Sequence, residues 1–74
     1  KTITLRTVES EIAISLEQVQ NRHKKVEIGS YPFFRKGKIG VSLVLRSVEK
    51  KQIEKSYKQI INFVKKNKIK IIER

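Results

Sequence analysis

The sequence predicts an α+β domain, a two-layer sandwich with two helices on one face of a four-stranded antiparallel sheet. Four short stretches alternate apolar and polar residues, which is the period of a half-buried strand. Two longer stretches repeat apolar residues every three or four positions, as amphipathic helices do. Their order along the chain is β-α-β-β-α-β, which is the order of the ferredoxin-like fold.

The first strand and the first helix are predicted from their apolar spacing. Residues 2–6 (TITLR) alternate, so one side of this strand should be buried. Residues 8–22 then place Ile12, Leu16 and Val19 at helical spacing, with acidic side chains near the start and basic ones at the end. That charge order suits the helix dipole, so we expect a helix of about this length.

A β-hairpin is predicted in the middle of the chain. Its first strand is VEIGSY, residues 26–31. Because proline cannot donate a ladder hydrogen bond, Pro32 should end this strand or mark a bulge or an edge. RKGK, residues 35–38, is predicted to be a turn around Gly37. IGVSLVLR, residues 39–46, alternates without interruption and is the second strand.

The second helix and the last strand complete the pattern. Residues 47–66 repeat apolar side chains at helical spacing, with Ser47 placed to cap the start. Asn67 is expected to take the left-handed conformation that often ends a helix, and residues 69–72 (IKII) are the last strand. Alternation then assigns six side chains to the sheet face away from the helices: Thr2, Thr4, Arg6, Ser42, Val44 and Arg46.

Length and composition indicate a single accessory domain, residues 1–74. The chain has no cysteine, which excludes a disulfide and a thiol nucleophile, and one histidine without aspartate argues against a metal site. It has no methionine, so we expect a segment of a longer, cytoplasmic protein. No apolar run approaches the ~20 residues of a membrane span, and we expect no membrane contact.

No catalytic, cofactor-binding or metal-binding residue is predicted. His23 lies in a lysine cluster at the end of the first helix, where a surface position that matches the helix dipole explains it. The sequence shows no Ser, His and acid arrangement and no phosphate-binding G-x-x-x-x-G-K-[ST] motif. We therefore expect the chain to be non-catalytic by itself.

The net charge of +11 makes nucleic-acid binding the alternative function. RNA-recognition modules carry exposed rings on their third strand, whereas KGKIGVSL, residues 36–43, has none. GKIG, residues 37–40, matches the KH-domain G-x-x-G loop but begins a predicted strand instead of joining two helices. Nucleic acid is thus an alternative partner and not the favoured one. Its candidate contacts lie on the second helix: Lys50, Lys51, Lys55, Lys58, Lys65 and Lys66.

The stretch IGSYPFF, residues 28–34, holds three of the five aromatic residues and the only proline. Its rings either line a ligand pocket or close an otherwise aliphatic core. We favour the second, with the rings packed over the helices or against a neighbouring domain. Gly29 should permit a bulge or a close approach to the backbone, and Pro32 should fix a bend. The candidate interface comprises Gly29, Ser30, Tyr31, Pro32, Phe33 and Phe34.

Two stretches resemble a known family: ESEIAISLEQVQ, residues 9–20, and VEIGSYPFFRKGKIGVSLVLRS, residues 26–47. They are similar to the segment, usually described as KH-like, that follows the molybdopterin-binding (MoaB/Mog-like) domain in the competence/damage-inducible protein CinA family. Eukaryotic FAD synthases contain a related domain, some with a similar Gly-Ser-Tyr-Pro stretch.

The resemblance implies an accessory role. In that family the upstream domain binds molybdopterin or a nucleotide, and some members are nucleotide pyrophosphatases. The resemblance therefore implies no cofactor in this segment, the upstream domain as its partner, and a homodimer as an alternative assembly. We expect the chain to complete the fold, the dimer or the cleft of that upstream domain.

Overall fold

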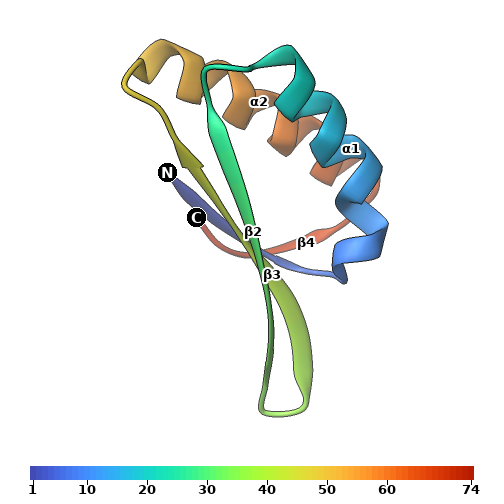
Figure 1. Ribbon diagram of the computed structural model, residues 1–74. Helices are drawn as coiled ribbons and strands as arrows, with labels where there is room; N and C mark the ends of the chain where they lie inside the picture. Colours follow the sequence, from blue (N-terminus) through green and yellow to red (C-terminus); the bar gives the residue numbers. More distant parts are fainter.

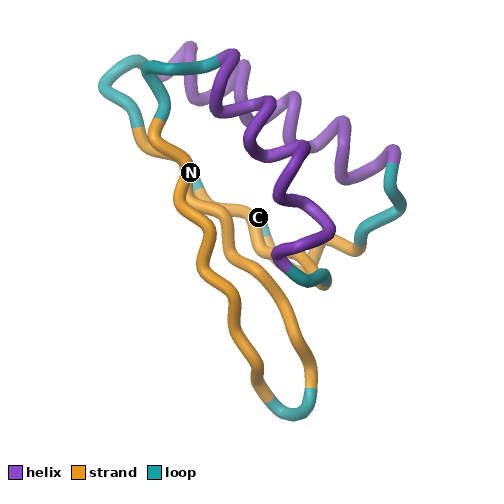
Figure 2. The backbone as a smooth tube through the Cα atoms, turned by 45° about the vertical axis from the view of Figure 1, so that its right-hand side comes forward, coloured by secondary structure: helices purple, strands orange, loops and turns teal.

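A computed structural model describes residues 1–74 and confirms the predicted order of elements. Two helices cover one face of a four-stranded antiparallel sheet, as Figures 1 and 2 show. The predicted ferredoxin-like α+β arrangement is therefore confirmed. The elements in chain order are β1 (Thr2–Arg6), α1 (Glu9–Arg22), β2 (Glu27–Arg35), β3 (Lys38–Arg46), α2 (Lys50–Lys66) and β4 (Lys70–Glu73).

The sheet has the strand order β2-β3-β1-β4, so β2 and β4 are its edges. β1 lies antiparallel between its two neighbours, with Thr4 opposite Ser42 of β3 and opposite Glu73 of β4. The register against β4 shifts between Thr4 and Leu5. Because β1 and β4 are neighbours, the two ends of the chain lie close together (Figure 1).

The core fills the space between the sheet and the helices. Alternation turns Ile3 and Leu5 of β1 toward the helices, and one stripe of α2 brings Ile60 and Val64 against them, all at 0% exposure. Burial of these apolar side chains holds the two layers together. Ten residues form this cluster: Ile3, Leu5, Ile12, Val19, Val26, Val41, Leu43, Leu45, Ile60 and Val64.

β2 is nine residues long and pairs with β3 along its whole length. The predictions that Pro32 ends this strand, marks a bulge or fixes a bend are therefore wrong. The alternative that Pro32 marks an edge is confirmed, because β2 is an edge strand. The N–H of Ile28 points away from β3, toward Gln20, and alternation gives Pro32, four residues later, the same orientation. The missing donor of Pro32 thus faces the open edge of the sheet, where no ladder hydrogen bond is lost.

A two-residue turn closes the β2–β3 hairpin. Lys36 and Gly37 have φ values of 52° and 76°, which are the left-handed values of a type I′ turn. Glycine adopts that conformation without strain, which explains Gly37 at this position. The GKIG stretch therefore begins a strand and does not form the loop between helices that a KH clamp needs.

The end of the hairpin projects beyond the rest of the sheet. Pairing between β1 and β3 reaches only Leu5 opposite Val41, so residues 32–41 form a two-stranded arm (Figures 1 and 2). The interpretation that the rings of IGSYPFF close the core is wrong. Phe34 is 69% exposed and Tyr31 is 52% exposed, because the arm extends past both helices and nothing covers it.

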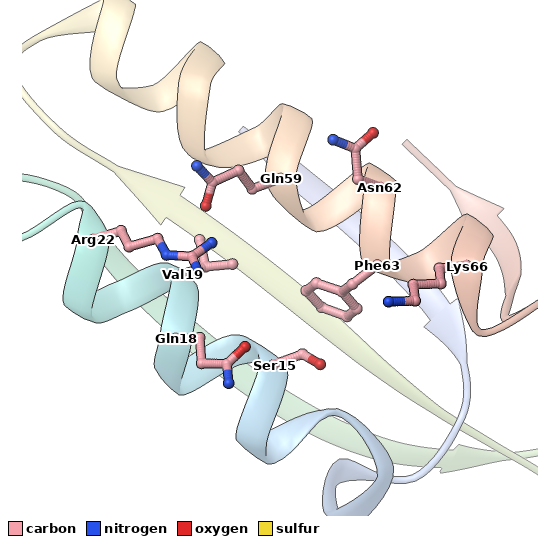
Figure 3. A pocket seen from close by; sticks show the side chains of 8 residues that line it. All are labelled: Ser15, Gln18, Val19, Arg22, Gln59, Asn62, Phe63 and Lys66. Atoms are coloured by element: carbon pink, nitrogen blue, oxygen red, sulfur yellow. The ribbon is translucent and has the colours of Figure 1, made fainter.

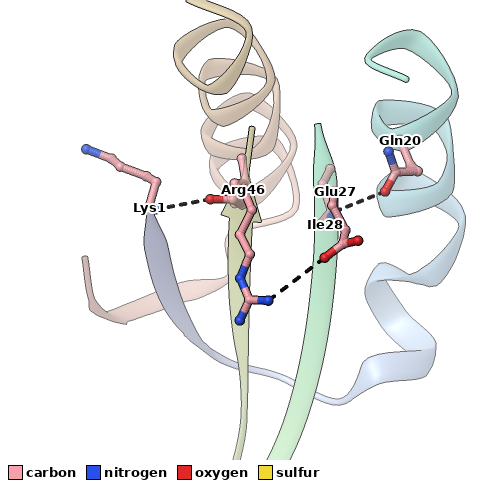
Figure 4. Close-up of polar contacts among 6 residues, drawn as sticks. Lys1, Gln20, Glu27, Ile28 and Arg46 are labelled. Carbon is pink, nitrogen blue, oxygen red and sulfur yellow. Dashed lines mark hydrogen bonds and ion pairs between the residues drawn. The ribbon is translucent and has the colours of Figure 1, made fainter. Parts of the chain in front are cut away.

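Gln20 ties the end of α1 to the start of β2. Its Nε2 donates to the carbonyl oxygens of His23 and Val26, and its Oε1 accepts the N–H of Ile28 at 3.0 Å (Figure 4). His23 is buried inside this connection, with no partner for its Nε2. The predicted surface position of His23 is therefore wrong, because the chain reverses there and encloses the ring.

The ends of α2 differ from the prediction. The helix starts at Lys50 with Glu49 as its N-cap residue, and Ser47 Oγ accepts the N–H of Glu49 ahead of the helix. At the other end Asn67 has a φ of −93°, and the left-handed residue is Lys68, with a φ of 56°. Neither helix is long and apolar enough to cross a membrane.

Replacing Gln20 with alanine should lower the free energy of unfolding by roughly 1–3 kcal/mol, because three backbone groups lose a hydrogen-bond partner at about 1 kcal/mol each. Urea denaturation followed by circular dichroism measures this change. Gln18→Ala, on the exposed side of the same helix, is the matched control and should change stability by less than about 0.5 kcal/mol. Equal losses in the two variants would contradict the role of Gln20.

Replacing Phe34 with alanine should leave the free energy of unfolding within about 0.5 kcal/mol of the parent chain, because the ring is mostly exposed. Leu43→Ala, which removes a fully buried side chain from the neighbouring strand, should cost about 2–5 kcal/mol. Thermal and urea denaturation of both variants provide the comparison. A loss for Phe34→Ala as large as that for Leu43→Ala would show that the ring belongs to the core.

Candidate functional site

The predicted interface residues, 29–34, lie on both faces of β2. Register and alternation place Ser30, Pro32 and Phe34 on the side of the helices, opposite Leu43, Val41 and Ile39 of β3. The other three residues, Gly29, Tyr31 and Phe33, lie on the outer face of the sheet. The stretch therefore supplies two different surfaces, and we describe each one separately.

The helix-side face of the arm is apolar and uncovered. Pro32 and Phe34 from β2 lie beside Ile39 from β3, which is 43% exposed. On the same side of the sheet, closer to the helices, Val41 is fully buried. This arm patch (Pro32, Phe34 and Ile39) thus continues the apolar face of the sheet beyond the point where the helices stop covering it.

The backbone edge of β2 offers little room for another strand. Gln20 already occupies the N–H of Ile28, and Pro32 has no N–H to offer at the equivalent position. A proline and an occupied donor on an edge both hinder pairing with a second strand. The arm therefore exposes mainly side chains, and two positions of its backbone edge, at Ile28 and Pro32, are closed to a second strand.

On the outer face, two rings of β2 lie over glycines. A Cβ atom on Gly40 would stand 2.3 Å from Cζ of Phe33, and one on Gly29 would stand 2.8 Å from the hydroxyl oxygen of Tyr31. Of the two alternatives for Gly29, a bulge is wrong, because the β2–β3 register is continuous there, and a close approach to the backbone is confirmed by the Tyr31 ring. Both glycines instead leave space for an aromatic ring to lie close to the sheet.

Beside Phe33, the outer face forms a hollow of about 560 Å³. Thr4 and Ser42 form its floor, with their hydroxyl oxygens 3.1 Å apart. Ten residues line this outer hollow: Thr2, Thr4, Arg6, Phe33, Arg35, Lys36, Lys38, Ser42, Ile72 and Glu73.

Sequence reasoning placed only the β1 and β3 residues on the outer face. Arg35 and Lys38 were not predicted on this face, because they were assigned to a polar turn. They in fact form the last pair of the β2–β3 ladder. Phe33 was not predicted there because the first strand of the hairpin was taken to comprise residues 26–31. Continued alternation through Pro32 places residues 31, 33 and 35 on one side, so it could have found Phe33 and Arg35. Alternation extended to the residue before Ile39 could have found Lys38.

The six predicted polyanion contacts all lie exposed on α2. The structure contains two ion pairs, Lys25 with Glu49 at 3.5 Å and Arg46 with Glu27 at 3.9 Å (Figure 4). Neither pair involves these lysines, so no carboxylate is paired with them on this solvent-facing side of the helix. These six lysines form the α2 lysine face. No aromatic ring lies among them, so this face can attract a polyanion but cannot stack on a base.

A groove of about 230 Å³ separates the two helices on the side away from the sheet (Figure 3). Arg22 and Lys66 supply its charges, Phe63 and Val19 its apolar surface, and Gln59 has a buried Oε1 without a partner. No three His, Cys, Asp or Glu side chains come together in a way that could hold a metal ion. The groove is lined mostly by amides and long flexible cations, which form no catalytic arrangement.

The comparison with protein families corrects the resemblance drawn from the sequence. A family model described as "FAD synthase, middle domain" matches residues 1–73. No curated protein and no solved structure matches the chain. The assignment to the molybdopterin-binding CinA family is therefore wrong, although the fold expected from it is present. Because the match covers almost every residue, the chain belongs to the FAD synthase middle-domain family.

Proposed function

We propose that the chain is a non-catalytic domain of a FAD synthase-related enzyme and that it packs against an adjoining domain of the same polypeptide through the arm patch. The observation that carries this proposal is the uncovered apolar side of the arm, where Phe34 is 69% exposed next to Ile39. An exposed apolar cluster on a projecting element is typical of a surface that another protein surface covers.

The description of the family favours an adjoining domain as the occupant. A middle domain has other parts of an enzyme on both sides of it in sequence. In this fold the two ends of the chain lie on the neighbouring strands β1 and β4 (Figure 1). Adjoining domains would therefore connect next to each other, at the end of the sheet where Leu45 of β3 pairs with Lys1. An occupant tethered in this way needs little intrinsic affinity, because its effective concentration is high.

A homodimer is the less favoured occupant of the same patch. Edge-to-edge pairing of two β2 strands would have to displace Gln20 from Ile28 and would meet Pro32, which has no N–H. A second copy would also bring another net charge of +11 against the first. Both arguments favour a partner other than the chain itself.

The alternative function, nucleic-acid binding through the α2 lysine face, rests on one observation. Six exposed lysines share that face, and none of them takes part in an ion pair. A polyanion bound there would be held by charge alone, so its affinity would fall steeply with salt. A slope near zero against the logarithm of salt concentration would remove this alternative.

Replacing Phe34 with serine should weaken association with the adjoining domain about tenfold or more, since burying such a ring contributes about 1.5–3 kcal/mol. Sedimentation equilibrium of the 74-residue chain, alone and mixed with the separately produced adjoining domains, measures this change. The melting temperature should stay the same, because the ring is not part of the core.

The matched controls for this experiment are two exposed isoleucines. Ile39→Ser removes a member of the arm patch and should weaken association, whereas Ile14→Ser alters α1 at a residue that is 75% exposed and should not. If all three serine variants associate as the parent chain does, the arm patch is not the docking surface. Self-association of the chain that Phe34→Ser abolishes would assign the patch to a homodimer.

A further inference from the structure

The outer hollow carries a strong excess of positive charge. Two of its cations, Arg35 and Lys38, are the last residue of β2 and the first of β3, and Lys36 lies in the turn between them. Arg6 adds a fourth cation from β1, and Glu73 is the single acidic residue in the lining. None of the four cations takes part in an ion pair. A hollow with these charges suits an anion.

Arg6 and Arg35 are held in defined positions. Arg6 Nη1 donates to the carbonyl oxygen of Ile39 at 2.9 Å, which fixes its guanidinium beside the floor. The guanidinium of Arg35 lies over the Phe33 ring, 4.9 Å from its centroid. A guanidinium on a ring keeps its donors free at the edge and presents a flat outer surface. Such a surface can stack on a base while the donors bind a phosphate.

Phe33 is positioned by the sheet beneath it. Its ring end occupies the space that a side chain at Gly40 would fill, and only glycine leaves that space free. Tyr31 lies two residues earlier on the same outer face, with its ring over Gly29 and half of its surface exposed. The outer face therefore offers two rings from β2, the strand next to the one that carries the rings of an RNA-recognition module.

The floor of the hollow adds polar groups suited to a sugar or a base edge. Thr4 and Ser42 each present a hydroxyl group, and only one of the two can donate to the other at a time. The second hydroxyl hydrogen and the remaining lone pairs are free for a ligand. The Phe33 ring, the fixed guanidinium groups and the hydroxyl groups thus meet in one hollow of the size of a small ligand, and Tyr31 lies on the same face outside it.

We propose that the outer hollow binds a nucleotide unit, with the phosphate held by Arg35, Lys38 and Arg6 and the base stacked on the Arg35–Phe33 pair. The same unit could come from a free nucleotide or from a single-stranded nucleic acid, since both supply a phosphate next to a flat base. This site is distinct from the arm patch, which faces the helix side, and from the α2 lysine face, which lacks rings.

The test measures binding of the 74-residue chain to three probes at low and moderate salt. A short fluorescein-labelled oligouridylate represents the strand, ADP represents the free nucleotide, and inorganic polyphosphate represents charge without a base. Fluorescence anisotropy reports the labelled strand directly, and competition reports the other two. We expect saturable binding of the oligouridylate or of ADP, with polyphosphate a weaker competitor at equal phosphate concentration.

Charge-matched double variants separate the hollow from the lysine face. Arg35→Gln with Lys38→Gln and Lys55→Gln with Lys58→Gln each remove two positive charges. The hollow variant should bind the oligouridylate about tenfold or more weakly and reduce the slope against log salt by about 1.4, since each phosphate that is no longer neutralised lowers it by about 0.7. The α2 variant should change affinity less than about threefold, because distant charges act only through the screened field.

Phe33→Leu tests the stacking surface without changing charge, and leucine still covers Gly40. It should weaken binding about fivefold, because Arg35 loses the ring that holds its guanidinium flat for stacking on the base. Its melting curve checks the fold, and amide chemical-shift changes in the parent chain map the site independently of any variant. Those changes should cluster at residues 31–42 and in β1, not in α2.

Three results would each overturn the proposal. Equal losses in the two double variants, or polyphosphate competing as well as the oligouridylate, would show diffuse charge attraction only. Chemical-shift changes confined to α2 would place the site elsewhere. The absence of binding to any probe at low salt would also refute it. ADP binding assigns the site to a free nucleotide, and oligouridylate binding without ADP binding assigns it to a strand; each supports the nucleotide unit.

Discussion

The continuous register between β2 and β3 is the constraint on which both candidate surfaces depend. Side chains in a strand alternate, so this ladder fixes Phe34 and Ile39 on the helix side and Phe33 on the outer side. A slip by one residue would exchange the two faces. The Lys36–Gly37 turn prevents such a slip, because its left-handed geometry fits a hairpin of this register. Small, local backbone requirements therefore determine where the aromatic and basic side chains lie.

The protected edge of β2 limits how the arm can contact other molecules. A two-stranded projection with a free edge is prone to pair with other strands. Here the N–H of Ile28 already donates to Gln20 of α1. Pro32, four residues further along the same edge, has no N–H to donate. Specific recognition is then left to side chains, apolar on one face and aromatic and cationic on the other. The only proline in the chain thus protects an edge, which was one of the alternatives that its missing N–H left open.

The sequence predicted the element order and the outer position of Thr2, Thr4 and Ser42, because apolar period alone determines them. The sequence could not predict how far the arm extends. The alternation of side chains in a strand shows which face each side chain takes, but it does not show whether another layer covers that face. The rings of Phe33 and Phe34 were assigned to the core for this reason. The prediction for His23 was wrong in the opposite direction, because this side chain was expected at the surface and is buried. Its burial depends on the reversal of the chain after α1, which Gln20, three residues earlier, stabilises. Residue likeness in the GSYPFF stretch was shared between families, so it indicated the fold but not the family.

The two faces of the arm do not compete, although they share one backbone. Phe34 and Ile39 make the patch proposed for the adjoining domain, and Arg35 and Phe33 lie on the opposite side of the same two strands. A ligand in the outer hollow would neutralise charges at the tip of the arm without covering the arm patch. Both faces can therefore be occupied at the same time, because the ladder keeps the two sets of side chains on opposite sides of the arm.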